Sequence, residues 1–414
     1  MQVACKCGKK ITVNDNMAGE TVHCIRCGRK IDVPAPKAPK PKPAADAPEE
    51  SPADVPAQPA PAASWRDSLY WLFAVASLPI AVMLGQPKGP GIKEKIETEV
   101  AKQGEEAKQA LKDLEEKGDE TLETLLALIP GKRLPGSAFP RDSKMHWLFA
   151  LASAVIFGCI ILSCFAPGSA EPLHLLLVGL FTGTMGVMLL LMAHAITIVG
   201  AFVQFCMLEA DDPNTDFFVV FFGFTFGVGL VEELCKFLPL IWYYRRFRTI
   251  TWRTACLWGL ASGTGFGISE GIMYSVTFYN GIEPFMDYVV RFVSCVASHA
   301  VWTAAAGVAM YRNQDLFQEL WGRPVADEMY RGPEQEHKTD EATQNWNILL
   351  GMALIRVLVV VMFLHGLDDA ALTKDMYFLA LLTDIASFGF LAWQIESCRR
   401  EEAPPTPEVE PAAE

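Results

Sequence analysis

The chain has 414 residues, of which 51% are hydrophobic and 20% are charged, and its formal net charge is −13. Apolar and charged residues are segregated along the chain, and the apolar runs are too long for the amphipathic helices of a soluble core. The acidic balance favours solubility of the charged segments and argues against a nucleic-acid partner.

Residues 1–33 form a cysteine-rich segment. Two tight cysteine pairs, each followed by glycine, flank a stretch that can form a hairpin: Cys5, Cys7, Cys24 and Cys27. Two such turns facing each other make a tetrahedral four-cysteine zinc ribbon, whose folding energy comes largely from the metal. A disulfide-stapled domain is the alternative, but zinc thiolates and the surrounding basic residues suit the reducing cytoplasmic side. We expect this segment to bind structural zinc and an unidentified cytoplasmic partner.

Three other segments have compositions unlike a folded core. Residues 34–64 are rich in Pro and Ala and are predicted to form a disordered tether. Residues 87–144 carry Glu and Lys at helical spacings, which predicts a solvated helix or helical hairpin. The tail, residues 398–414, is acidic and proline-containing, and is predicted to be disordered.

Long apolar runs predict an all-α polytopic membrane protein. A helix needs about 20 residues to cross the hydrocarbon core, and apolar runs occur at residues 69–85, 145–166, 173–208, 217–244, 256–279, 285–311, 348–367 and 376–394. Helices are expected because backbone N–H and C=O groups in lipid must be satisfied within the segment. We predict about eight transmembrane helices, with a first membrane segment at residues 65–86 and a membrane domain at residues 145–397.

Loop charges predict the orientation of these helices. Four arginines lie at or just after the end of the fourth span, whereas the loops at residues 208–216 and 279–287 contain no Lys or Arg. By the positive-inside rule, both termini are cytoplasmic and residues 87–144 lie outside the cell membrane. The alternative keeps residues 87–144 inside. In that case the first segment, which contains Pro79, dips into the bilayer without crossing, and residues 173–208 cross twice.

Three ionisable side chains interrupt the fourth span, in the sequence GLVEELCKFLPL. Ionisable groups at mid-bilayer are costly, so they persist where they pair or line a polar cavity. Glu232 and Lys236 lie one helical turn apart and can form an ion pair, whereas Glu233 is rotated by about 100°. One ion pair needs only one acid, so the second acid indicates a function.

The following spans add polar groups at a similar depth. Glu270 lies in the fifth span beside three glycines whose spacing predicts close helix packing: Gly263, Gly267 and Gly271. His299 lies about 13 residues from each polar flank of its span and hence near the midplane. A lone buried histidine is often structural, but His365, with Asp368 one turn further on, provides a second imidazole at this level.

Carboxylates and imidazoles on neighbouring helices suit the activation of water. A carboxylate takes the proton of water, and an imidazole or ammonium group stabilises the oxyanion that forms at an attacked carbonyl. The same groups are ligands for a divalent metal such as zinc. Proton or ion relays of transporters also use intramembrane Glu and His, so the residues alone leave these alternatives open.

The order of these groups resembles the PrsW family of intramembrane proteases, relatives of the CAAX-prenyl endopeptidase group. The shared motifs occupy residues 217–372: Glu232-Glu233-x-x-Lys236, Gly263-x-x-Phe266-x-x-x-Glu270, His299-x-x-Trp302-Thr303, and His365 with Asp368. The resemblance implies a membrane endopeptidase with catalytic Glu232, Glu233, Glu270, His299 and His365, supported by Lys236 and Asp368. Gly271 departs from the pattern, which usually has Asn there. Neither the sequence nor the resemblance decides between a metal-dependent and a glutamic mechanism.

We therefore expect an endopeptidase of the cytoplasmic membrane that cleaves a single-span protein, such as an anti-sigma-like regulator, within the lipid bilayer. A non-catalytic scaffold or sensor and an ion- or proton-coupled transporter are the alternatives. Other charged residues within spans are assigned structural roles, in which Arg291 snorkels to the outer edge and Arg356 pairs with Asp384. Cysteines within spans are interpreted as small apolar residues.

Overall fold

The computed structural model describes residues 2–4, 10–12, 21–23, 30–32, 65–86, 92–117, 122–141, 143–163, 170–207, 215–247, 250–279, 281–322 and 336–402. The chain divides into two compact units, residues 1–59 and residues 60–414.

The first unit contains two antiparallel hairpins. In one, β1 (Gln2–Ala4) pairs with β2 (Lys10–Thr12), and in the other, β3 (Thr21–His23) pairs with β4 (Lys30–Asp32). In the sequence, one of the two cysteine pairs lies between the strands of each hairpin. The four cysteines, the tether at residues 34–64 and residues 403–414 of the tail lie outside the described residues. Zinc binding by this unit therefore stays a prediction.

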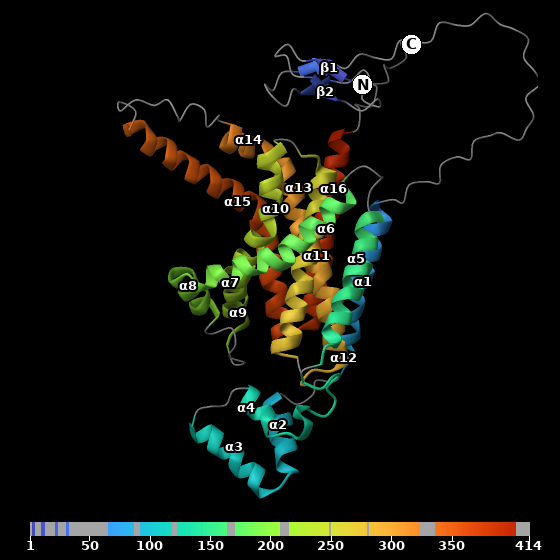
Figure 1. The fold of residues 1–414 in the computed structure, drawn as a ribbon, viewed down its shortest axis with the longest axis vertical. Helices are drawn as coiled ribbons and strands as arrows, with labels where there is room; N and C mark the ends of the chain where they lie inside the picture. The colour runs from blue at the N-terminus through green and yellow to red at the C-terminus, as the bar shows by residue number, and fades with distance from the viewer. Residues whose placement is uncertain are drawn as a thin grey trace, which may run out of the picture. The chain divides into compact units, whose positions relative to one another are not determined.

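The described part of the second unit is helical, and it contains seven stretches long and apolar enough to cross a membrane (Figure 1). These stretches are α1 (Trp65–Leu84), α5 (Met145–Ser163), Pro172–Ala195, Phe217–Phe247, Phe285–Arg312, Trp346–Thr373 and α16 (Tyr377–Glu402). The chain is thus a multi-pass membrane protein.

Three of the seven stretches contain a π-helical turn. Pro172–Ala195 comprises α6 (Pro172–Phe181), η3 (Thr182–Gly186) and α7 (Val187–Ala195). Phe217–Phe247 comprises α9 (Phe217–Gly223), η4 (Phe224–Gly229) and α10 (Leu230–Phe247). Phe285–Arg312 comprises α12 (Phe285–Val289), η5 (Val290–Cys295) and α13 (Val296–Arg312), which α14 (Gln314–Gly322) follows. The stretch Trp346–Thr373 is the apolar part of α15 (Glu336–Thr373).

The predicted fifth span forms α11 (Trp252–Thr277), which is 26 residues long but is not among the seven. It is rich in Gly, Ser and Thr and therefore less apolar than the others. Its glycines pack directly on α13, where a Cβ at Gly263 would collide with the backbone of His299 and Ala300. The close packing predicted from the glycine spacing is confirmed, and contacts with α5, α6 and α13 replace contact with lipid.

The predicted third span, residues 173–208, divides into two helices. It ends as a spanning helix at Ala195, because Ile196 has an extended backbone (φ −72°, ψ 118°). The chain then turns into α8 (Thr197–Met207), whose 11 residues are shorter than the roughly 20 needed to cross a bilayer.

The charged segment between α1 and α5 is a small helical unit with a buried core of its own. It consists of α2 (Ile92–Ala101), α3 (Glu105–Lys117), α4 (Leu122–Ala127) and the 3-10 turn η2 (Pro130–Lys132), and its core includes Ile96, Val100 and Leu126.

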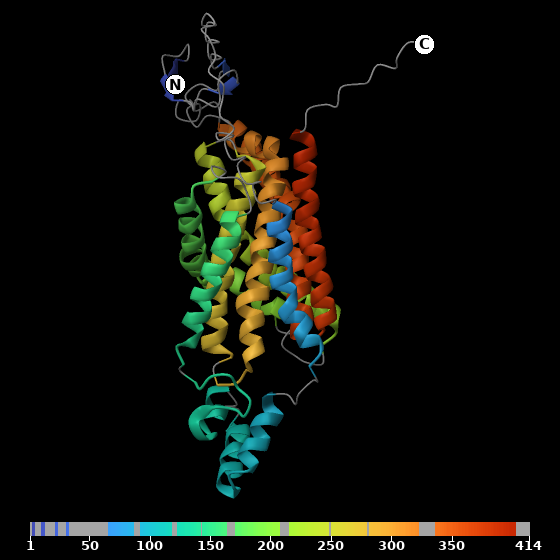
Figure 2. The ribbon, with the colours of Figure 1, turned by 90° about the vertical axis from the view of Figure 1, so that its right-hand side faces the viewer.

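The backbone of this segment is joined to the α11–α12 loop. The Leu134 N–H donates to the Gly281 carbonyl and the Ala138 N–H to the Glu283 carbonyl, both at 2.8 Å. This unit therefore lies at the end of the bundle opposite the arginine-rich α10–α11 connection (Figure 2).

Candidate active site

The polar residues predicted from the sequence converge inside the helical bundle. Glu232, Glu233 and Lys236 lie on α10, Glu270 on α11, His299 on α13 and His365 on α15. All six side chains are buried, with relative exposures between 0% and 7%. We call these six residues the acid–histidine cluster.

Lys236 lies at the centre of this cluster. Its Nζ donates to Glu232 Oε2 at 3.1 Å and to Glu233 Oε1 at 2.9 Å, and it lies 2.7 Å from His299 Nδ1. The ammonium group also lies 4.4 Å from the centroid of the Phe266 ring. A buried ammonium group is tolerated only when its charge and its donors are satisfied, and these contacts meet both needs.

His299 connects this lysine to a second acid and a second cation. Because an ammonium group only donates, His299 Nδ1 is the acceptor, and the proton lies on Nε2, which donates to Glu270 Oε2 at 2.6 Å. The other oxygen of Glu270 forms an ion pair with Arg291, whose guanidinium lies over the Tyr274 ring at 3.7 Å. Arg291 is 6% exposed, so the prediction that it snorkels to the outer edge is wrong.

His365 faces carboxylates with both ring nitrogens. Nδ1 lies 3.0 Å from Glu233 Oε1, and Nε2 lies 3.3 Å from Asp369 Oδ2 and 3.7 Å from Glu232 Oε2. The ring stacks on Trp302, with centroids 4.6 Å apart and an interplanar angle of 21°. Trp302 is itself fixed because its Nε1 donates to Ser387 Oγ at 2.9 Å. Packing thus sets the orientation of the His365 ring.

Glu232, His299 and His365 each offer a ligand atom, and these atoms lie within 4.8 Å of one another. One carboxylate and two imidazoles are the donor set of many hydrolytic zinc sites. Each histidine is also hydrogen-bonded through a ring nitrogen to a carboxylate other than that of Glu232. His299 contacts Glu270, and His365 contacts Glu233. Such carboxylates orient metal-binding histidines. The donor chemistry therefore fits a divalent metal.

The charges of the surrounding groups also fit a divalent metal. The network of contacts contains four carboxyl groups and two cations. The carboxyl groups are those of Glu232, Glu233, Glu270 and Asp369, and the cations are Lys236 and Arg291. With neutral histidines and ionised acids, an excess of two formal negative charges remains, which one divalent cation balances. Lys236 holds Glu232 and His299, so its ammonium group competes with a metal for these two ligands.

The model of one protein family matches residues 171–390, which include the whole acid–histidine cluster, and it is described as PrsW family intramembrane metalloprotease. The chain belongs to this family. No curated protein and no solved structure matches the chain. Membership of the PrsW family makes the chain a peptidase, which argues against the scaffold and transporter alternatives. The family description also favours the metal-dependent mechanism over the glutamic one.

Asp368, which follows His365 by about one helical turn, is not the carboxyl group that pairs with His365. The partner of His365 is Asp369, one residue further on, which sequence reasoning missed although an i,i+4 pair also meets on a helix. Asp368 is buried and Oδ1 has no hydrogen-bond partner among the described residues. Asp384 of α16 accepts a hydrogen bond from Ser298 Oγ at 2.8 Å. Arg356 is exposed, so the predicted pair of Arg356 and Asp384 does not form.

Gly271 stands where the family pattern usually has Asn. A Cβ at this position would lie 3.0 Å from the Phe292 ring, in an aromatic cluster with Tyr288 and Phe149. A side chain at position 271 would therefore be directed at the Phe292 ring, which has to shift to admit it.

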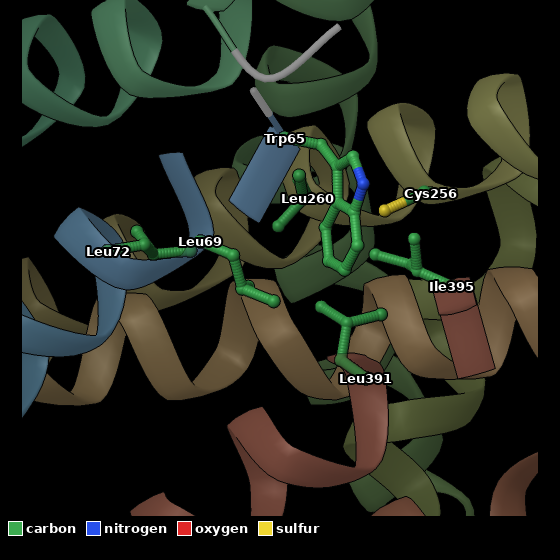
Figure 3. A pocket seen from close by; sticks show the side chains of 7 residues that line it. All are labelled: Trp65, Leu69, Leu72, Cys256, Leu260, Leu391 and Ile395. Carbon is green, nitrogen blue, oxygen red and sulfur yellow. The ribbon is translucent and has the colours of Figure 1, made fainter. Parts of the chain in front are cut away.

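A separate small hollow, with a cavity volume of about 10 Å³, lies between α1, α11 and α16 (Figure 3). Trp65, Leu69, Leu72, Cys256, Leu260, Leu391 and Ile395 line it. In Figure 3 these apolar side chains point towards one another, and no acid or histidine is among them. The hollow therefore does not belong to the site.

Proposed function

We propose that this PrsW-family chain is an endopeptidase that hydrolyses a peptide bond of a membrane-anchored protein at the acid–histidine cluster. The observation that carries the proposal is the convergence of Glu232, His299 and His365, from three helices, with ligand atoms within 4.8 Å of one another. An ion pair needed only for folding does not require two imidazoles and several acids. A hydrolytic site requires a group that activates water and groups that stabilise an oxyanion.

Glu233 is the proposed base. Its Oε1 is held by Lys236 and His365, whereas its Oε2 is buried and accepts no hydrogen bond from any described residue. This oxygen takes a proton from the attacking water as the water oxygen bonds to the carbonyl carbon. The same carboxyl group then gives the proton to the leaving amide nitrogen as the C–N bond breaks. Lys236 and His365 keep the carboxylate oriented throughout.

Glu232, His299 and His365 are the residues that would hold a divalent metal. When bound, such an ion polarises the scissile carbonyl and lowers the pKa of water. Glu270, itself paired with Arg291, keeps the Nε2–H tautomer of His299. His299 Nδ1 is thereby left as the atom that faces the cluster.

The substrate class and the orientation follow from the chain's own pattern. Because the cluster is enclosed by membrane-spanning helices, we propose a single-span membrane protein as substrate. We also propose, from the distribution of Lys and Arg in the loops, that both termini are cytoplasmic and that the α2–α4 unit lies outside. We further propose that Cys5, Cys7, Cys24 and Cys27 bind structural zinc, supported by the position of each cysteine pair between two paired strands. This zinc ribbon would serve an as yet unknown cytoplasmic partner.

The test is cleavage of a co-expressed, doubly tagged single-span protein. Glu233→Gln keeps the size of the side chain and removes the base, and it is expected to lower the cleavage rate by about 100-fold or more. Asp384→Asn is the matched control, because Asp384 is also a buried acid on a membrane helix but lies outside the cluster. We expect Asp384→Asn to cleave normally. Unchanged cleavage by folded Glu233→Gln rejects the assigned role.

A further inference from the structure

The acid–histidine cluster is separated from the lipid-facing side of α7 by only two apolar side chains. The ring of Phe266 lies 5.7 Å from the ring of His299, centroid to centroid, and also covers Lys236. On its other side, Phe266 packs in a small buried cluster with Cys235 and Leu190, and Leu190 comes from α7. Neighbouring side chains of α7 are exposed, with Leu191 at 55% and Met192 at 57%. The helix α7 is therefore the outer wall of the site on this side.

The preceding segment, α6 together with the start of η3, is tightly anchored to the core, whereas α7 is not. A Cβ at Gly179 would lie 3.2 Å from the Ala261 carbonyl oxygen, and one at Gly183 would lie 2.6 Å from that of Gly265. Thr182 Oγ1 also hydrogen bonds with Ser262 Oγ at 2.8 Å. In α7, by contrast, Leu190 is the one buried residue.

Two breaks in the α-helical backbone bound α7. Before it, the π-helical turn η3 has the sequence TGTMG with two glycines, and after it Ile196 is extended. Single π-turns interrupt the regular hydrogen-bond ladder and occur often at functional sites. A rigid helix between two such breaks can rotate about them as a hinged element.

We propose that α7 is a lateral gate, which moves away from Cys235 and Phe266 to admit a transmembrane substrate from the bilayer to the acid–histidine cluster. The proposal rests on the proteolytic function proposed above. Opening is energetically feasible because lipid tails are as apolar as Leu and replace the contacts that Leu190 loses. Movement of α6 together with the start of η3, by contrast, would break the Thr182–Ser262 hydrogen bond and the backbone contact at Gly183.

A disulfide across the closed gate provides the first test. Leu190→Cys places a thiol beside the native Cys235, and an added oxidant then cross-links α7 to α10. We expect the cross-linked variant to lose at least about 10-fold in cleavage of the single-span substrate and to regain it on reduction. Leu190→Cys in a Cys235→Ser background is the control, and oxidant should leave its cleavage unchanged. Full cleavage with the disulfide verified by mass spectrometry overturns the gate.

The second test does not depend on cleavage. Cys235 and Cys295 are both 7% exposed, but Cys235 lies beneath α7 and Cys295 packs with α1, α15 and α16. Wild-type full-length protein in lipid vesicles is treated with N-ethylmaleimide, and labelling of each cysteine is followed by peptide mass spectrometry. A gate predicts labelling of Cys235 at least about five times faster than Cys295. Equally slow labelling overturns the gate, whereas fast labelling without cleavage by the wild-type protein counts against the proteolytic function alone.

Discussion

The inner helices of the bundle differ from the outer helices in the size of their side chains and in the polar groups that they contain. In the span Phe285–Arg312, which includes α13, 94% of the apolar window is buried, whereas the value is 28% for α5. The outer helix exposes residues such as Leu151, and α13 buries alanines such as Ala304 and Ala305. Lipid selects for large apolar side chains on the outer helix. Neighbouring helices instead select for small residues, and they also shield the polar groups of the site.

The largest effect is expected from removing a polar group on an inner helix. His299→Asn removes a ligand and the link between Lys236 and Glu270. Loss of a residue that only orients a ligand costs about 10- to 100-fold in metal affinity, so loss of the ligand itself should cost more than about 100-fold. Metal content of purified full-length protein measures this.

The N-terminal cysteines provide the control for that measurement. Cys24→Ser combined with Cys27→Ser should abolish the zinc binding proposed for the first unit and leave the metal binding proposed for the acid–histidine cluster unchanged. His299→Asn should have the opposite pattern. If both variants lose the same zinc, or if His299→Asn retains wild-type metal content, the assignment of two separate sites is wrong.

A smaller effect, of opposite sign in the two regions, is expected from adding one methyl group. Gly263→Ala on α11 forces a Cβ into the backbone of α13, and such overpacking costs about 1–3 kcal/mol. Gly158→Ala on α5 meets nothing within 4 Å and gains up to about 1 kcal/mol of helix propensity. Thermal unfolding midpoints in detergent distinguish the two. Equal midpoints would mean that the α11–α13 contact is not tight.

Most of this inner region could be predicted from the sequence, because its departures from hydropathy are large. Glu232, Glu233 and Lys236 are conspicuous because they interrupt an apolar run. The spacing of the glycines of α11 predicts a close helix contact, and the structure confirms it as the contact between α11 and α13. The path of residues 173–208 could not be predicted from hydropathy, because the turn at Ile196 depends on backbone angles and breaks no apolar pattern.

Side-chain pairing was less predictable than the choice of residues. His365 is followed by Asp368 and Asp369, and both spacings place a carboxylate one turn away. Rotation of α15 against its neighbours selects Asp369, and the sequence does not encode this rotation locally. The role of Arg291 could have been found by asking which cation compensates Glu270 at the same depth. Depth counted from the loops placed Arg291 too near the surface.

The smallest effect is expected at a carboxyl group outside the membrane-spanning helices. Burial raises the pKa of Glu283, the charges of Asp287 and Asp375 add to the shift and Lys95 opposes it, and together they bring the pKa to about 7. Between the ordinary value of 4.5 and about 7, the folded state therefore binds a proton that the unfolded chain has released. The contact between residues 92–138 and the α11–α12 loop should be strongest below about pH 4.5 and weaken as pH rises towards 7.

Hydrogen exchange at two amides measures this contact directly. The amides of Leu134 and Ala138 donate to the carbonyls of Gly281 and Glu283, so their exchange, corrected for the intrinsic rate, should accelerate between about pH 4.5 and pH 7. Glu283→Gln stays neutral and should abolish the acceleration, while amides within α13 serve as the reference because helix packing screens them from water. An acceleration that persists in Glu283→Gln would assign the titration to another group at this end of the bundle. An acceleration that extends to the amides of α13 would mean that helix packing does not screen the inner helices from water better than the rest of the molecule.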